Sequence, residues 1–179
     1  MDATLRDDIV RSIPSLRAFA MGLTRSMDRA DDLVQDTMLR AFARIDTFES
    51  GTNLQAWLFT ILRNSFYSSL RKRQREVDDA DGAYAARLMT PPEQEGRLLY
   101  NDFLRAFGKL NPDQREALLL VAASGFPFED AARIMGVALG TAKSRVIRAR
   151  ARLAQLMEID ADKDLGPDQQ TQAAMHDSP

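Results

Sequence analysis

The chain of 179 residues contains no cysteine, which excludes a disulfide framework and a thiolate metal site. Its one histidine, His176, lies in a polar segment, and the sequence holds no glycine-rich phosphate-binding loop. Few residue types remain from which a catalytic centre could be built. We therefore expect a protein that is not an enzyme and that binds no cofactor and no metal.

Long hydrophobic runs are also missing, because no apolar stretch approaches the roughly 20 residues that span a bilayer. The first residues, MDATLRDDIV, do not resemble a signal peptide. We expect a cytoplasmic protein with no membrane contact. The alternation typical of strands never persists, whereas apolar residues recur at spacings of three and four, so the predicted class is all-α.

Charge of one sign is not in excess either, since the formal net charge is −2. The charges are instead segregated along the chain. Basic runs occupy 71–75 and 143–152, and acidic runs occupy 28–36, 76–81 and 158–168. This segregation indicates more than one charged partner surface.

The stretch from Phe126 to Leu156 predicts two helices joined by a tight turn at Gly136, with the second helix starting near Gly140. Phe128, Ala131, Ala132 and Met135 form the apolar stripe of the first helix, and the second buries Ala142, Val146, Ala149, Leu153 and Leu156. Its outward face carries Lys143, Ser144, Arg145, Arg148 and Arg152. An apolar rear and a basic front are typical of a DNA-binding helix-turn-helix. The alternative is a solvated face, although such faces usually mix signs.

A helix over 28–45 is predicted to have two distinct faces. Val34, Met38, Ala41, Phe42 and Ile45 would face the core. Asp32, Gln35, Asp36 and Leu39 follow at i, i+3, i+4 and i+7 and form an exposed acidic-polar strip. A solvated helix surface is the main alternative for this strip. A metal site is disfavoured because a straight helix does not converge its carboxylates on one ion.

The next helix is predicted to begin after the turn Phe48 to Asn53, with Thr52 or Asn53 as its N-cap. Leu54, Trp57 or Leu58, Ile61, Ser65 and Phe66 would point inward, and core packing is the expected role of Trp57. The opposite side presents Thr60, Arg63, Asn64, Tyr67 and Arg71. An aromatic ring, an amide and arginines on one face suit an unpaired nucleic-acid strand.

The remaining segments predict two domains and a tether. Pro14 should break the first helix near Ser12-Ile13. Asn111 and Gln114 predict a helix start with a capping box for a helix over 113–124. The expected domains are 5–75 and 97–159, joined by a flexible acidic linker over 76–96 and followed by a disordered tail over 160–179.

The motifs DDLVQDTMLRAF, FESGTNLQAWLFTILRN, LNPDQREALLL and GTAKSRVIRARARL, in this order, resemble the extracytoplasmic-function (group IV) sigma factors of the sigma-70 superfamily. The segments GTNLQAWLFTILRNSFYSSLRKRQREV and DQREALLLVAASGF are similar to the EcfG-type subgroup, which serves the general stress response. One departure is Pro127, where the subgroup more often has a serine. Proline removes a hydroxyl cap but suits a first helical turn.

The resemblance implies a region 2 helical bundle and a region 4 helix-turn-helix. The clamp helices of the β′ subunit of core RNA polymerase would contact Asp32, Gln35, Asp36 and Leu39. Minus-10 DNA would contact Phe48, Asn53, Arg63, Asn64, Tyr67 and Arg71. Minus-35 DNA would contact Thr141, Lys143, Ser144, Arg145, Ile147, Arg148 and Arg152, with Arg145 and Arg152 on phosphates.

Regulation also follows from the resemblance. EcfG-type factors are held by a NepR-type anti-sigma factor, which a PhyR-type response regulator sequesters through a sigma-like decoy domain. Two other functions stay open: a stand-alone helix-turn-helix regulator, which would favour pseudo-palindromic sites, and a sigma-like decoy. The decoy would need an attached receiver domain or a lost DNA-reading face.

Overall fold

The computed structural model describes residues 3–76 and 94–158. They belong to two compact units, of which the first holds α1 to α4 and the second α5 to α8. Every regular element in these ranges is helical, which confirms the predicted all-α class. The greater part of the predicted linker and all of the predicted tail lie outside the described residues.

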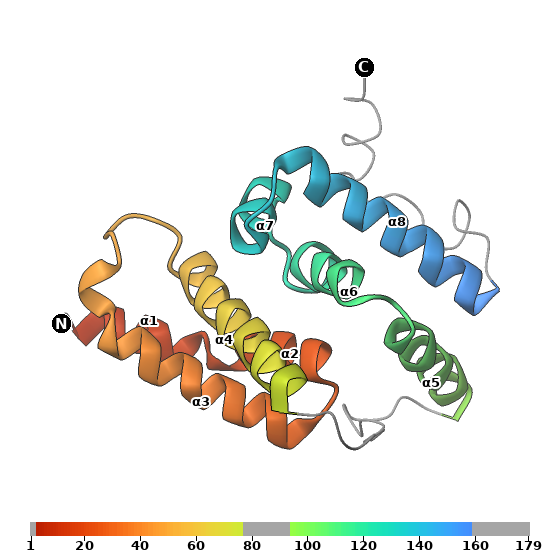
Figure 1. Cartoon of the computed structure of the whole chain (residues 1–179), viewed down its shortest axis with the longest axis horizontal. Coiled ribbons are helices and arrows are strands. Elements are labelled where there is room, and N and C mark those ends of the chain that lie inside the picture. The colour runs from red at the N-terminus through yellow and green to blue at the C-terminus, as the bar shows by residue number, and fades with distance from the viewer. Residues whose placement is uncertain (1–2, 77–93, 159–179) are drawn as a thin grey trace. The chain divides into compact units, whose positions relative to one another are not determined.

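The first unit is a bundle of α1 (Ala3–Arg11), α2 (Ile13–Thr24), α3 (Met27–Ala43) and α4 (Leu54–Glu76), with a 3-10 turn η1 (Ile45–Thr47) after α3. Helix α2 packs against α3, and α4 packs against both, as Figure 1 shows. The rings of Phe19 and Phe59 meet at the centre with centroids 4.9 Å apart. Both rings are almost fully buried, so they join α2 to α4.

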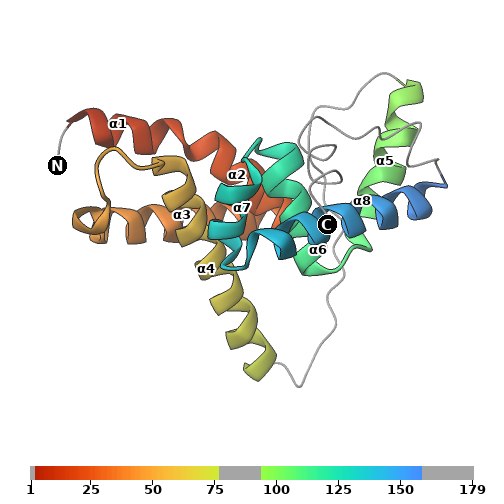
Figure 2. The same ribbon diagram turned by 90° about the horizontal axis from the view of Figure 1, so that it is seen from above.

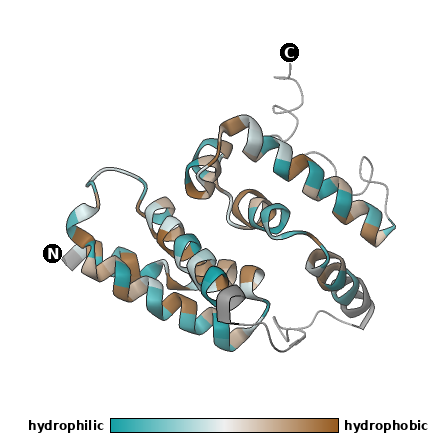
Figure 3. Ribbon diagram, viewed as in Figure 1, coloured by the Kyte–Doolittle hydropathy of each residue, from teal (hydrophilic) through white to brown (hydrophobic). Residues whose placement is uncertain are grey.

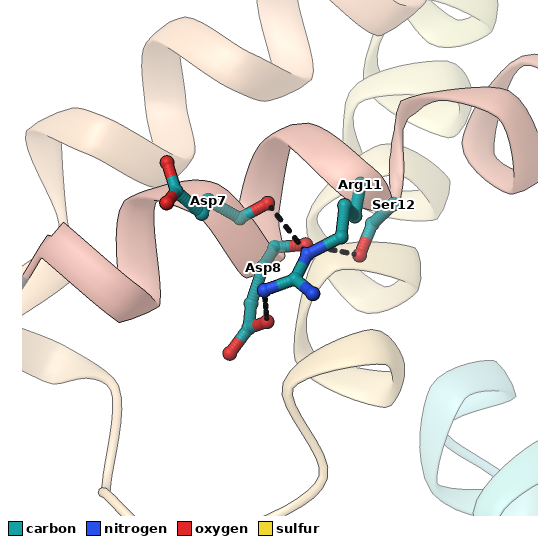
Figure 4. A network of polar contacts seen from close by, with 4 residues as sticks. All are labelled: Asp7, Asp8, Arg11 and Ser12. Carbon is teal, nitrogen blue, oxygen red and sulfur yellow. Dashed lines mark hydrogen bonds and ion pairs between the residues drawn. The ribbon is translucent and has the colours of Figure 1, made fainter.

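Helix α1 ends where the sequence predicts a break. The Ser12 hydroxyl donates a hydrogen bond to the Asp8 carbonyl oxygen at 2.9 Å, and the Ser12 amide donates to the same oxygen at 3.2 Å. Arg11 also donates to the Asp8 carboxylate at 2.7 Å (Figure 4). Pro14 then lies in the first turn of α2, where its missing amide costs no helical hydrogen bond.

The inward face of α4 differs from the prediction. Leu58, Phe59 and Leu62 are fully buried, and Ser65 is 2% exposed. Ile61 and Phe66, which we expected inside, are only half-buried. Apolar and aromatic residues occupy nearly every side of this helix, so their spacing did not define one stripe. Packing against α2 and α3 decides which of them are covered.

The second unit holds α5 (Gln94–Gly108), α6 (Pro112–Leu118), a π-helical segment η2 (Leu119–Ala123), α7 (Phe128–Met135) and α8 (Leu139–Met157). Helix α8 packs against α5, α6 and α7. The predicted capping box is confirmed, because Asn111 accepts from the Gln114 amide at 2.8 Å and the Gln114 side chain accepts from the Asn111 amide at 3.3 Å. Gly136 ends α7 in the left-handed region at φ 66°, as predicted.

Three boundaries in this unit differ from expectation. Helix α5 begins at Gln94, before the second domain expected from residue 97, because a polar first turn gives no apolar periodicity to detect. The helix predicted over 113–124 is α6 followed by the wider turn of η2. Pro127 is the N-cap of α7 and makes no side-chain cap. None of these three differences changes the residues at which α8 begins and ends.

Within the described ranges, no helix combines the length and the apolar character needed to cross a membrane.

Candidate functional site

The first candidate surface is the α3 strip, formed by Asp32, Gln35, Asp36 and Leu39. Leu39 is 72% exposed, and Asp36 forms an ion pair with Arg40 one turn later at 2.8 Å. Phe42, predicted to face the core, is 37% exposed instead. The buried stripe of α3 runs through Leu33, Val34, Thr37 and Ala41, which leaves Phe42 at its edge.

An apolar ridge of Leu39 and Phe42 therefore lies beside the carboxylates of this strip. The i, i+3 spacing of the two residues could have revealed that ridge. Exposed apolar side chains grouped with charges are typical of a protein-binding surface.

The second candidate surface begins at the loop before α4. The Phe48 ring packs against Trp57 with centroids 5.3 Å apart, so Trp57 supports the loop from the first turns of α4. The Asn53 side-chain oxygen accepts from the Ala56 amide at 3.1 Å, which makes Asn53 the helix N-cap. Gly51 has φ 91°, a conformation that favours glycine. The loop is thus fixed at both ends while residues 49–53 stay exposed.

The polar face of α4 continues this surface. The Arg63 guanidinium lies over the Tyr67 ring, 4.7 Å from its centroid, and both side chains are half-buried. Asn64 and Arg71 are exposed, as is Lys72. Figure 2 shows the C-terminal part of α4 extending past α1, α2 and α3. These residues form a cationic and aromatic face on one side of one helix.

The third candidate surface is the outward side of α8, whose hydrophilic and hydrophobic bands are visible in Figure 3. The buried stripe is as predicted for Ala142, Val146, Ala149 and Leu153, whereas Leu156 is half-buried. Thr141, Ser144, Arg148 and Arg152 are exposed, and Lys143 and Ile147 are half-buried. The Ser144 hydroxyl donates to the Gly140 carbonyl oxygen at 2.8 Å, and Arg148 Nε donates to the Ser144 carbonyl oxygen at 3.2 Å.

Arg145 is placed differently from Arg148 and Arg152, which are exposed. Its side chain is only 20% exposed and forms an ion pair with Asp113 of α6 at 2.8 Å. Sequence reasoning gave Asp113 no role beyond the start of a helix. The pairing joins residues far apart in the chain, so periodicity within α8 could not have shown it.

Comparison with known families matches both units. Residues 9–76 match the Sigma-70 region 2 family, and residues 100–153 match the Sigma-70 region 4 family. The α3 strip, the loop before α4 and the polar face of α4 up to Lys72 lie in the first match, and the outward side of α8 up to Arg152 lies in the second.

The chain is also similar to whole proteins of one kind. It is 58% identical to the ECF RNA polymerase sigma factor EcfG of Rhodopseudomonas palustris, over 96% of this chain and 95% of that protein. It is 33% identical to the sigma factor CarQ of Myxococcus xanthus, over 84% and 87% of the two chains.

A solved structure agrees in fold as well as sequence. The sigma factor RpoE of Bartonella quintana, crystallised with the anti-sigma factor NepR, is 52% identical with a TM-score of 0.77, over 89% of this chain and 99% of that one. The predicted resemblance is thus confirmed. The chain belongs to the extracytoplasmic-function RNA polymerase sigma factors, of the EcfG type, and is a non-enzymatic subunit that gives core RNA polymerase its promoter specificity.

Proposed function

We propose that this sigma factor divides promoter recognition between its two units. The first binds the β′ clamp helices and the opened minus-10 element, and the second reads the minus-35 duplex. One observation carries this division: the exposed faces differ in chemistry, with apolar and acidic groups on α3 and hydroxyl and guanidinium groups on α8. A protein partner suits the first face, and a polyanion suits the second.

The α3 strip is the proposed contact with core polymerase. Leu39 is the most exposed large hydrophobic residue of the described part of the chain. Its burial under a partner would remove apolar area from water. Asp36 and Asp32 lie one and two turns before it on the same strip, and charges at the rim of an interface fix register and exclude wrong partners. We assign Asp32, Gln35, Asp36 and Leu39 to this contact.

The loop before α4 and the polar face of that helix form the proposed minus-10 site. A base extruded from the duplex needs a preformed pocket and a stacking surface. The Phe48–Trp57 packing and the Asn53 cap hold the loop in place, while the Arg63–Tyr67 pair presents an aromatic ring beside a cation. We assign Phe48, Asn53, Arg63, Asn64, Tyr67 and Arg71 to the single strand.

The outward side of α8 is the proposed minus-35 reader. A guanidinium can donate two hydrogen bonds to a guanine edge in the major groove. Arg148 and Ser144 lie on the most exposed ridge of α8, and Lys143 and Ile147 flank it on one side. We assign Lys143, Ser144, Ile147 and Arg148 to bases, and Thr141 and Arg152 to the duplex beside them.

We further propose that a NepR-type anti-sigma factor holds this chain and that a PhyR-type response regulator releases it. The solved relative is a complex with NepR, and the α3 strip with Phe42 offers the exposed apolar surface that an inhibitor would cover. The response would be general stress, because the chain is similar to EcfG along nearly its whole length. The site of action would be the cytoplasm, where core polymerase works.

Reconstituted transcription tests the proposal. The chain and core polymerase are supplied with a promoter of the EcfG type or with the same DNA carrying scrambled minus-35 and minus-10 elements. Transcripts should start at one position on the intact promoter and disappear on the scrambled one. Equal transcription of both would contradict the proposed promoter reading, and no co-purification with core polymerase would instead favour a stand-alone regulator.

Footprinting tests the inhibitor surface separately. Binding of a NepR-type protein should protect the α3 strip from surface labelling. If it protects neither unit, the proposed anti-sigma contact is wrong.

A further inference from the structure

The recognition helix α8 is tied to α6 by an ion pair between partly covered groups. Arg145 Nη2 lies 2.8 Å from Asp113 Oδ2, and the two side chains are 20% and 52% exposed. The second terminal nitrogen of Arg145, Nη1, is buried and has no hydrogen-bond partner. The guanidinium is therefore directed into the protein, and one carboxylate meets it there.

Asp113 is itself held in a fixed place. It lies in the first turn of α6, directly after Pro112 and between the two residues of the capping box, Asn111 and Gln114. Both hydrogen bonds of that box are made. A carboxylate at this end of a helix is also favoured by the helix dipole. The backbone that carries the acceptor of the ion pair is thus fixed by contacts within α6.

The place of Arg145 on α8 explains what the pair can control. Each residue turns a helix by about 100°, so Arg145 lies beside the buried stripe of Ala142, Val146 and Ala149. Ser144 and Arg148 lie further round, on the exposed side. A contact at the edge of the stripe opposes rotation of α8 about its own axis. Such a rotation would turn the exposed ridge away from the bases.

We propose that Arg145 is a positioning residue, which sets the rotation of α8 on α6 through Asp113 and so aims the base-reading side chains, rather than a phosphate contact. The inference rests on the proposed reading of minus-35 DNA by α8. It replaces the phosphate role that the family resemblance implied for Arg145. Asp113, in a helix that carries no reading residue, becomes a determinant of promoter specificity.

The test uses the full chain bound to core polymerase and measures two quantities for each variant. The first is the ratio of affinities for the intact minus-35 promoter and for the same DNA with a scrambled minus-35 element. The second is the slope of log affinity against log salt concentration, which reports phosphate contacts at about 0.9 per contact on duplex DNA. The variants are Arg145→Ala, Arg145→Lys and Asp113→Asn, with Arg152→Ala as the matched control.

A positioning role predicts that Arg145→Ala lowers the affinity ratio by about 10-fold and leaves the salt slope unchanged, since coupled contacts are worth about that much. Asp113→Asn should lower the ratio similarly, although removing an acid from a DNA-binding unit should by charge alone favour binding. Arg145→Lys keeps the charge and should retain part of the ratio. Arg152→Ala should reduce the slope by about 0.9 and weaken both DNAs equally.

The proposal is overturned if Arg145→Ala lowers the salt slope by about one contact while the ratio stays intact, or if Asp113→Asn leaves the ratio unchanged. Should Arg145→Ala unfold the second unit, Asp113→Asn and Arg145→Lys still decide. Failure of the proposed function is seen separately, because the unsubstituted protein would then fail to discriminate between the two DNAs.

Discussion

Helices α3 and α8, one from each unit, are built alike on their buried sides and unlike on their exposed sides. Both bury a stripe of small and branched apolar residues against their neighbours. The outer side of α3 presents Leu39 and Phe42, whereas that of α8 presents Ser144, Arg148 and Arg152. The buried stripe makes each helix part of its fold, and the exposed side determines whether its partner is a protein or DNA.

Removing core volume from one unit should have the largest effect and shows whether the two units are separate folding units. Leu62 is fully buried in the first unit, and Leu62→Ala should cost about 2–5 kcal/mol of that unit's stability. Leu120, fully buried in the second unit, is the matched position. Hydrogen exchange resolved along the chain should show each substitution loosening its own unit alone. If either variant loosens both units equally, they unfold as one.

Reversing a charge on the α3 strip should weaken the binding of the protein partner, core polymerase. Asp36→Arg places a cation at the proposed clamp contact, and we expect core polymerase affinity to fall by at least about 2 kcal/mol, roughly 30-fold. Stability should change little, because the Asp36–Arg40 pair is an exposed i, i+4 pair worth about 0.3–0.5 kcal/mol.

The matched control for this reversal is Asp7→Arg, which makes the same charge change on an exposed residue of α1. Its affinity for core polymerase, measured by the same binding assay, should match that of the unsubstituted protein. An equal loss in both variants would mean that overall charge, not the strip, governs docking.

Shortening a side chain on the exposed side of α8 should weaken the discrimination between DNA sequences. Arg148→Ala should cost about 1–3 kcal/mol of discrimination at one minus-35 base pair if the guanidinium makes a bidentate base contact. The measurement is holoenzyme affinity for a set of single-base minus-35 variants. Arg133→Ala on α7, where the side chain is 73% exposed and paired with Asp130, removes the same charge and should leave discrimination intact. A uniform loss across all sequences would make Arg148 a phosphate contact.

The smallest expected effect concerns the aromatic ring on α4. Tyr67→Ala should weaken holoenzyme binding to DNA with an unpaired minus-10 segment by about 1 kcal/mol, the low end for base stacking, because the ring is already half-buried beneath Arg63. Tyr67→Phe keeps the ring and should bind as the unsubstituted protein does. If Tyr67→Phe loses as much affinity as Tyr67→Ala, the hydroxyl group and not the ring makes the contact. Duplex minus-35 binding should not change in either variant.

The contrast between α8 and α4 also explains why the buried face of one helix could be predicted from the sequence and that of the other could not. In α8 the side away from the buried stripe is mostly polar or cationic, so the spacing of Ala142, Val146, Ala149 and Leu153 predicted the buried stripe correctly. In α4 the residues from Trp57 to Tyr67 are apolar or aromatic on several sides, and the spacing did not select Phe59 and Leu62. Periodicity identifies a face only when the other faces are polar.

The sequence predicted local features correctly where all the interacting residues lie within a few positions of one another. The capping box at Asn111, the left-handed Gly136 and the break before Pro14 were all predicted. Contacts between distant segments were not, since no local pattern joins Arg145 to Asp113. The sequence therefore predicted which helix faces form the candidate surfaces. The contacts between these faces and other helices became visible only in the packed structure.

The hydrogen bonds within α8 have a consequence for how binding energy is divided. The Ser144 hydroxyl and Arg148 Nε already donate to backbone carbonyl oxygens of their own helix. For Ser144, a base edge that accepts from the hydroxyl exchanges one acceptor for another, and such an exchange yields little net affinity. For Arg148, the bond through Nε holds the side chain along the helix while its two Nη groups can still donate to a base edge. Part of the entropy cost of ordering this arginine is therefore met before DNA binds, and base discrimination on this side of α8 should come from Arg148 more than from Ser144.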